Sequence, residues 1–227
     1  MNAFDILQQR NVTRLCHFTK FQKLPIILSS EEGILATAAI TADVKDTIDE
    51  NRYDGLPEYV CCSIQYPNSW FLEGAKQRNA DRLFRDWVVL YISPTILNCK
   101  SAKFSPGNAS AEHGKYIHDR MEEIDAIFAD TVPTFKYPRP KTMLPSCPTD
   151  GQAEILIHHN IPRRFIIGIA VNDVALAKRV DALQEMNTAD APRPISIAPD
   201  IMSSAWSTQV KKGLVPKEYI YNPSEGY

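Results

Sequence analysis

The sequence predicts an α+β fold. Strand-type segments are too numerous for a helical bundle, and the helical segments between them are too unevenly spaced for a doubly wound sheet. The 227 residues, of which 44% are hydrophobic and 23% charged, are typical of a globular protein and argue against disorder. We expect a single domain over residues 1–227, because this length suits one full hydrophobic core.

Strands are predicted from alternating or continuous apolar runs. Residues 14–19 alternate with the period of a strand, and Ile34 and Leu35 follow a turn at Gly33. Residues 155–157 are all aliphatic, which is typical of a strand buried on both faces. The expected strands are 14–19, 33–35, 58–65, 87–92, 154–158 and 165–171.

Helices are predicted from apolar periodicity and from their terminal residues. The segment 21–30 has Pro25 in its first turn and ends before Gly33, and the segment 41–52 begins at Thr41, a suitable cap. The stretch 131–151 is rich in proline and is expected to be an irregular loop. The expected helices are 3–10, 21–30, 41–52, 73–85, 112–129 and 173–186.

Composition argues against several classes of protein. No run approaches the roughly 20 apolar residues of a membrane span, and the N-terminal residues lack the pattern of a signal peptide, so we expect a cytoplasmic protein that does not bind membranes. The five cysteines have no CxxC spacing, and no HExxH or Gly-x-Gly-x-x-Gly motif is present. We therefore expect no disulfide framework, no metal site and no Rossmann-type cofactor binding.

Glu154 is the strongest candidate for a catalytic residue. It opens the apolar run 155–157 and follows the proline-rich loop. Burial of a carboxylate that serves no function would cost several kcal/mol of folding free energy, so a functional role is favoured. Loops also often deliver catalytic groups to the ends of strands. The alternative is an acid on an edge strand that points to water.

A basic excess lies in the middle of the chain, although the net charge is −2. Residues 76–141 contain 11 Lys and Arg against 8 Asp and Glu, and Lys136, Arg139 and Lys141 lie in the proline-rich loop. Such clusters can contact a phosphodiester backbone. A solvated protein surface is the ordinary alternative.

Three short motifs follow one another in an order that resembles a known family. The first motif consists of LCHFT at 15–19, LPIIL at 24–28 and GIL at 33–35. The second is ENR at 50–52, which precedes YV at 59–60. The third is QAE at 152–154, which precedes three aliphatic residues. In order and spacing these motifs resemble the DarT toxins, which are nucleic-acid ADP-ribosyltransferases. The resemblance covers nearly the whole chain.

The resemblance implies a fold of two small mixed or antiparallel sheets, flanked by helices, with an NAD cleft between them. His17 and Thr19 lie two residues apart on one strand, so they face the same side and can both bind the cofactor. The family implies that they hold the nicotinamide half of NAD, with Leu24 also at the cofactor. NAD is the expected co-substrate, and no metal is expected.

The same resemblance assigns catalysis to Glu154 and Arg52. Cleavage of the bond between nicotinamide and ribose creates an oxocarbenium-like centre, which a carboxylate stabilises. Glu154 could also remove a proton from the attacking nucleobase nitrogen. Arg52 offers a planar fork of donors for the NAD pyrophosphate or for the acceptor base.

Single-stranded DNA is the expected acceptor, because a duplex buries the base nitrogens. Segments 61–70 and 147–151 depart from the pattern of thymine-directed DarT members, so guanine is the preferred base and thymine the next. Tyr137 can stack on a base. The candidate DNA contacts are Lys136, Tyr137, Arg139, Lys141 and Gln152.

Other functions are compatible with the sequence. An enzyme of the same fold could modify RNA or protein, and a non-catalytic module could use the cleft to bind a nucleotide. The chain could also be a structural partner whose motif matches are coincidental. If it is a DarT-type toxin, an antitoxin is expected, either a macrodomain-type enzyme or another ADP-ribosyl hydrolase.

Overall fold

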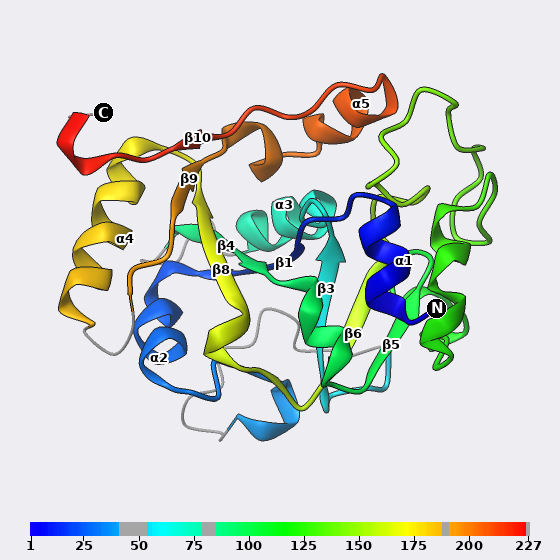
Figure 1. Ribbon diagram of the computed structural model, residues 1–227, viewed down its shortest axis with the longest axis horizontal. Helices are drawn as coiled ribbons and strands as arrows, with labels where there is room; N and C mark the ends of the chain where they lie inside the picture. Colours follow the sequence, from blue (N-terminus) through cyan, green and yellow to red (C-terminus); the bar gives the residue numbers. More distant parts are fainter. Residues whose placement is uncertain (41–53, 79–84, 188–190, 226–227) are drawn as a thin grey trace.

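A mixed β-sheet of eight strands forms the centre of the protein in the computed structural model (Figure 1). The structure describes residues 1–40, 54–78, 85–187 and 191–225. The strand order is β10-β9-β8-β4-β1-β3-β6-β5, and a separate ladder pairs β2 with β7. The strands are β1 (Leu15–Lys20), β2 (Ile34–Leu35), β3 (Tyr59–Ile64), β4 (Trp87–Ile92), β5 (Ala102–Ser105), β6 (Glu154–His158), β7 (Asn160–Ile161), β8 (Ile166–Val171), β9 (Ile195–Ile197) and β10 (Tyr219–Ile220).

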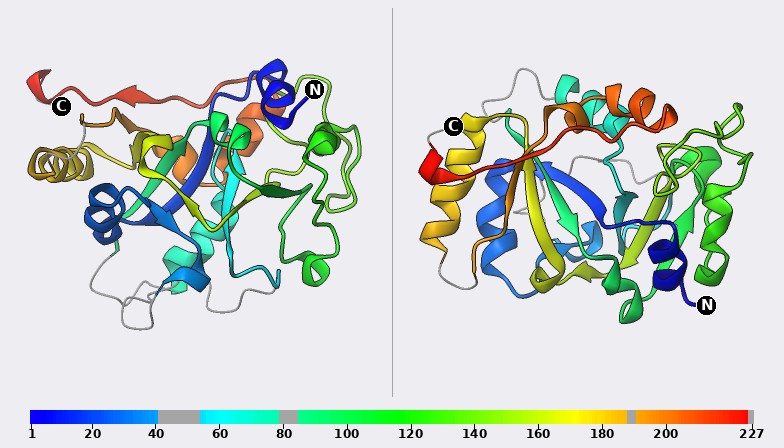
Figure 2. Two further views of the ribbon diagram at one scale, coloured as in Figure 1. Left: turned by 60° about the horizontal axis from the view of Figure 1, so that its bottom comes forward. Right: turned by 45° about the horizontal axis from the view of Figure 1, so that its top comes forward.

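Helices lie around this sheet. In the views of Figures 1 and 2, α2 and α4 lie side by side at one end, and α1 lies beside the irregular segment 106–153 at the other. The α-helices are α1 (Ala3–Gln9), α2 (Leu24–Ser29), α3 (Ser69–Arg78), α4 (Val174–Met186) and α5 (Ala205–Lys211). The 3₁₀ segments are η1 (Phe21–Lys23), η2 (Thr37–Ala39), η4 (Pro94–Asn98), η5 (Ala111–Gly114), η6 (Met121–Phe128), η7 (Arg163–Phe165), η8 (Pro199–Met202) and η9 (Pro223–Glu225).

The large sheet consists of two halves joined at one short pairing. Strand β1 pairs with β3 only at Leu15 with Ile64 and at Cys16 with Ser63, whereas β1 pairs with β4 along its whole length. From His17 onward β1 and β3 follow different directions (Figure 1). The predicted α+β class is confirmed, but the predicted separate sheets are halves of one sheet, the β4 half (β10-β9-β8-β4-β1) and the β6 half (β3-β6-β5).

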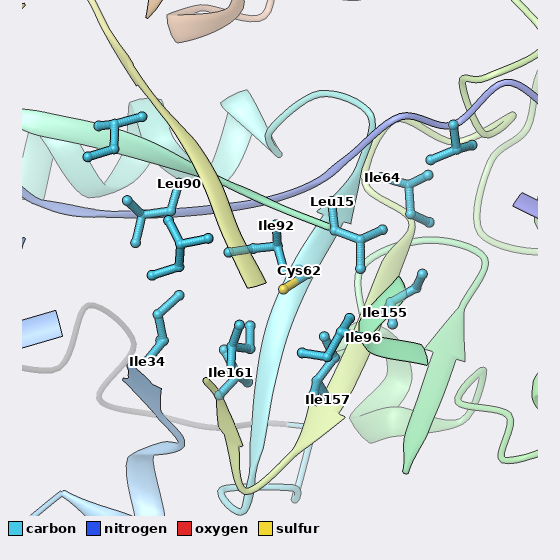
Figure 3. Packing of buried hydrophobic residues seen from close by; sticks show 14 of the residues in the cluster. Leu15, Ile34, Cys62, Ile64, Leu90, Ile92, Ile96, Ile155, Ile157 and Ile161 are labelled. Carbon is cyan, nitrogen blue, oxygen red and sulfur yellow. The ribbon is translucent and has the colours of Figure 1, made fainter. Parts of the chain in front are cut away.

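Strand β4 shows how an apolar run supplies both faces of the sheet. All six of its residues are buried, as expected for a continuous apolar strand. Val88, Leu90 and Ile92 belong to one core cluster, and Trp87, Val89 and Tyr91 belong to the other. Figure 3 shows the first cluster, in which side chains from both halves of the sheet pack together.

The structure agrees with the six predicted strands and with the helices predicted at 3–10, 21–30 and 173–186, and it differs at two other predicted helices. Helix α3 begins at Ser69, earlier than expected, and the predicted helix 41–52 lies outside the described residues. The predicted continuous helix 112–129 is wrong, and its helical part is the 3₁₀ segment Met121–Phe128. Glu112, His113 and Gly114 have φ angles of 46°, 59° and 86°, which end any helix, and His118 pairs its backbone with Phe104 of β5.

A partly buried ionic network fixes the join between the two halves. Arg14, immediately before β1, forms an ion pair with Glu218 in the C-terminal segment, and its Nε donates to the Gln65 carbonyl after β3, at 2.9 Å. The Tyr91 hydroxyl of β4 donates to the same carboxylate at 2.7 Å, and the Arg14 guanidinium lies 3.9 Å from the Tyr91 ring centroid. One arginine therefore connects β1, β3, β4 and the C-terminal segment.

Replacement of Glu218 by alanine should destabilise the protein by about 3 kcal/mol, because it leaves the Arg14 charge in a poorly solvated site without its partner. The free energy of unfolding from urea titration measures the effect. Glu122→Ala is the matched control, since Glu122 pairs with Arg120 on the surface and its loss should cost less than 1 kcal/mol. Equal losses for the two variants would contradict the structural role of the network.

Candidate active site

A cavity of about 270 Å³ opens where β1 and β3 separate. One wall is formed by β1 and by the turn that leads into β2, and the other by β3, the start of β6 and the start of α3. The cavity exists because the two strands pair over only two residues and then separate. Its lining is mostly apolar, with a few polar side chains that come from distant parts of the sequence.

Glu154 lies in the wall of this cavity at the first position of β6. Strand β6 pairs with β3 on one side and β5 on the other, so it is an inner strand and not the edge strand of the alternative interpretation. The carboxylate is half-buried, and its Oε2 accepts a hydrogen bond from the Ala109 N–H at 3.0 Å. The fully buried residues 155–157 anchor the strand that carries it.

His17 and Thr19 line the same cavity from the opposite half of the sheet. The Nδ1 atom of His17 lies 2.9 Å from the carbonyl oxygen of Cys61 on β3. Because a carbonyl only accepts, Nδ1 carries the hydrogen, and this bond orients the imidazole across the gap between the strands. Thr19, two residues further along β1, is only 6% exposed.

The two other residues assigned to the cofactor are Leu24 and Arg52. Leu24 is completely buried in a core cluster and is not among the residues that line the cavity, because the first turn of α2 directs it inward. Arg52 lies outside the described residues. Gly33, in contrast, forms part of the cavity wall with a φ of 66°, and a Cβ there would lie 2.2 Å from the Ile161 carbonyl oxygen.

Arg139, one of the predicted DNA contacts, forms hydrogen bonds within the proline-rich loop itself. Arg139 donates to the carbonyl oxygens of Cys147 and Leu144 at 2.6 and 2.8 Å. The residue is half-buried, and this burial lowers the pKa of its guanidinium. Arg139 therefore holds the loop together, and its contact with DNA stays a prediction.

Three of the other candidates, Lys136, Tyr137 and Lys141, remain at the surface. Tyr137 is 57% exposed, and the Lys136 ammonium lies 4.8 Å from its ring centroid. Lys141 is also exposed. Gln152 is half-buried, its N–H donates to Asp150, and it is not among the residues that line the cavity. None of the five candidate DNA contacts lines the cavity itself.

Several cavity residues were not singled out from the sequence. Asp54 is buried in the wall, where its Oδ1 accepts the Leu56 N–H at 3.1 Å. Asn68 and Phe71 at the start of α3 and Asn108 before Ala109 also line the cavity. The local signal for Asn68 is its position one residue before a helix, which is typical of an N-cap, but a cap pattern does not reveal a cavity.

The described residues offer little support for a metal site or a membrane span. Within them, no group of three or more His, Cys, Asp and Glu residues is arranged to hold a metal ion. Among the helices of the described part, none has the length and apolar character needed to cross a bilayer.

A family model described as "ssDNA thymidine ADP-ribosyltransferase, DarT" matches residues 16–203. The chain belongs to the DarT family. Membership confirms the predicted family and the enzyme class, ADP-ribosyl transfer to single-stranded DNA. No curated protein matches the chain by sequence.

Solved DarT structures share the fold. Thermus sp. 2.9 DarT in complex with ADP-ribosylated ssDNA is 18% identical with a TM-score of 0.60, and the match covers 84% of this chain and 96% of that one. The same DarT in complex with NAD+ is 20% identical with a TM-score of 0.56, over 81% and 93% of the two chains. Thermosipho africanus DarTG in complex with ADP-ribose is 17% identical with a TM-score of 0.51, over 84% of this chain and 51% of that one.

Burial also decides which cysteines of this DarT chain can react. It raises the pKa of the Cys16 thiol to about 12 and that of Cys147 to about 11, and it raises the pKa of Cys62 well above its usual value. Cys99 is exposed. Since the thiolate is the reactive form, the three buried thiols stay protonated and inaccessible near neutral pH.

With a thiol reagent such as iodoacetamide at pH 8, Cys99 should be alkylated rapidly, and Cys16, Cys62 and Cys147 only after denaturation. Peptide mass spectrometry at successive times gives the rate for each site. Addition of urea to the same sample is the control that makes all three accessible. Rapid native labelling of any of the three would show that the two cores are less closely packed than described.

Proposed function

We propose that this protein transfers ADP-ribose from NAD to a base in single-stranded DNA and releases nicotinamide. The observation that carries the proposal is the meeting of Glu154, His17 and Thr19 in one cavity, although they come from different halves of the sheet. Family membership supports the reaction class. The complexes of Thermus sp. 2.9 DarT with NAD+ and with ADP-ribosylated ssDNA support the two substrates.

The cavity is suited to the nicotinamide end of NAD. Its volume is near the lower limit for small-molecule sites, so it fits one end of a dinucleotide better than the whole. Its apolar lining suits a flat aromatic ring, and His17 and Thr19 supply hydrogen bonds at fixed positions. Arg52 is proposed to bind the pyrophosphate or the acceptor base through its planar fork.

Glu154 is proposed to act on both partners of the transfer. The bond between ribose C1′ and the nicotinamide nitrogen breaks, nicotinamide leaves as a neutral molecule, and negative charge at Glu154 stabilises the positive charge that develops on the ribose. A base nitrogen then bonds to C1′ and gives its proton to the carboxylate. The hydrogen bond from the Ala109 N–H holds that carboxylate in position.

Guanine is the proposed acceptor base, with thymine as the alternative. The departures of segments 61–70 and 147–151 from the thymine-directed pattern support guanine, and Cys61, Ser63 and Asn68 of the first segment line the cavity. The family description, which names thymidine, supports the alternative. The exposed Tyr137 with Lys136 and Lys141 is the proposed surface for the flanking nucleotides.

We also propose that the enzyme is the toxin of a toxin-antitoxin pair. It would act in the cytoplasm, where NAD and DNA are both present. The resemblance of the motifs to DarT toxins supports this role, and it suggests a macrodomain-type or other ADP-ribosyl hydrolase as the antitoxin. The DarTG chain of Thermosipho africanus extends well beyond the region matched here, which covers 51% of that chain.

Glu154→Gln should reduce the transfer of labelled ADP-ribose to single-stranded DNA by about 10²- to 10⁴-fold, because an amide neither accepts the proton nor carries the negative charge. NAD should still raise the melting temperature of the variant. Glu122→Gln, on the surface, is the control and should transfer at the wild-type rate.

The same variant tests the toxin role in cells. Wild-type protein should arrest bacterial growth, and Glu154→Gln at equal expression should not. Transfer by Glu154→Gln at more than a tenth of the wild-type rate would remove Glu154 from the mechanism. Inactivity of both proteins with every acceptor, together with intact nucleotide binding, would favour the non-catalytic module.

Oligonucleotides that differ in one base should identify the acceptor. We expect label on single-stranded DNA that contains guanine and none on the matched strand without it, because the base must leave a duplex to reach the cavity. Matched RNA, duplex DNA and a protein lysate are the comparison acceptors. Modification of thymine alone would correct the base, and label only on RNA or protein would overturn the DNA assignment.

A further inference from the structure

Asn68 lies in the cavity wall at the N-terminus of α3. Its side chain is only 2% exposed. The Oδ1 atom accepts the Phe71 N–H at 3.1 Å, and the backbone carbonyl accepts the Leu72 N–H at 3.0 Å, so Asn68 caps the helix. These bonds fix the orientation of the amide, because exchange of its oxygen and nitrogen would lose the cap.

The other end of this amide has no partner. The Nδ2 atom of Asn68 is buried and has no hydrogen-bond partner among the residues that the structure describes. Leaving a buried donor unsatisfied costs roughly 1–3 kcal/mol. Serine or aspartate would cap the helix equally well without this cost. Capping therefore explains the oxygen of Asn68 and leaves its NH₂ group unexplained.

Asn68 is connected to Glu154 through one residue. The Asn68 N–H donates to the Ser63 hydroxyl at 2.9 Å. Ser63 on β3 lies directly opposite Glu154 on β6, and side chains at such paired positions are neighbours on the same face of the sheet. Both Ser63 and Glu154 line the cavity. Asn68 therefore lies on the Glu154 side of the cavity.

We propose that Asn68 is a specificity-determining residue that donates a hydrogen bond from Nδ2 to the carbonyl oxygen of the incoming base. The proposal rests on the proposed DNA transferase function. A base whose nitrogen faces Glu154 presents its neighbouring ring substituents to the same wall. The donor is satisfied only when an acceptor enters, so a base without that oxygen leaves it unpaired, which is how buried donors discriminate between ligands.

The position of Asn68 favours the base over NAD as the source of this acceptor. The groups assigned to NAD, His17 and Thr19, lie on β1, in the β4 half of the sheet. Asn68 is bonded to β3, in the β6 half, beside the carboxylate that must reach the attacking nitrogen. Phe71, three residues along the same helix, lines the cavity and gives this wall an aromatic face for a planar base.

The test uses variants that keep the cap and remove the donor. Asn68→Asp is nearly isosteric, and Asn68→Ser lacks the donor amide without adding a charge beside Glu154. Both retain an oxygen that can cap α3. Asn222→Asp is the matched control, since Asn222 also accepts a backbone N–H, that of Ser224, and is not among the cavity residues. Melting temperatures show whether each variant is folded.

For each protein, kcat/KM is measured with single-stranded DNA that carries the natural base or an analogue without the carbonyl. The analogue is 2-aminopurine if the wild type modifies guanine and 4-thiothymine, which keeps the N3 proton and replaces the carbonyl oxygen by a weakly accepting sulfur, if it modifies thymine. The wild type should prefer the natural base by on the order of 10-fold or more. Asn68→Ser and Asn68→Asp should lose this preference, and the melting-temperature shift caused by NAD should stay unchanged.

Other outcomes would overturn the proposal in distinct ways. Retention of the wild-type base preference by Asn68→Ser would show that Asn68 only caps the helix. Loss of the NAD-induced shift in both variants would assign the donor to NAD. If the wild type itself labels no DNA, the proposed function fails, and this result is seen before any variant is compared.

Discussion

The two-residue pairing of β1 with β3 is the constraint on which the rest of the structure depends. A longer pairing would close the sheet and remove the cavity, and its loss would separate the two halves. Arg14 stabilises the pairing at this length, because its guanidinium binds the Gln65 carbonyl after β3 and the Glu218 carboxylate beside β4. An ionic network outside the cavity thus maintains the opening between the strands.

The chemistry of the site follows from this separation. His17 lies at the first position of β1 beyond the pairing, and its Nδ1 hydrogen reaches a β3 carbonyl that has no β1 backbone opposite it. Glu154 opens an inner strand whose next three residues are fully buried, so its position is rigid. Asn68 places an amide donor in the same wall. Two strands and one helix start therefore bring a carboxylate, an imidazole and an amide to one cavity.

The sequence predicted correctly the strands whose apolar pattern follows directly from their burial. Strands β4 and β6 have the bounds expected from their apolar runs, because a strand buried on both faces needs such residues at every position. The helix prediction for 112–129 failed because the path of this segment does not follow from its own apolar pattern. Its apolar spacing suggested a helix, but the left-handed residues around Gly114 and the backbone pairing of His118 with Phe104 decided its path. Strands β9 and β10, which are short and lie at one end of the sheet, gave no comparable signal.

The sequence by itself determined the fold class, the family and the identity of Glu154, His17 and Thr19 as candidates, because motif order and strand periodicity are local properties. Only the tertiary structure decided which residues share the cavity. It assigned Arg139 to loop carbonyls and Leu24 to the core, and it left the Nδ2 of Asn68 unsatisfied. Hydrogen-bond partners and burial depend on segments far apart in the chain, so no local pattern could specify them.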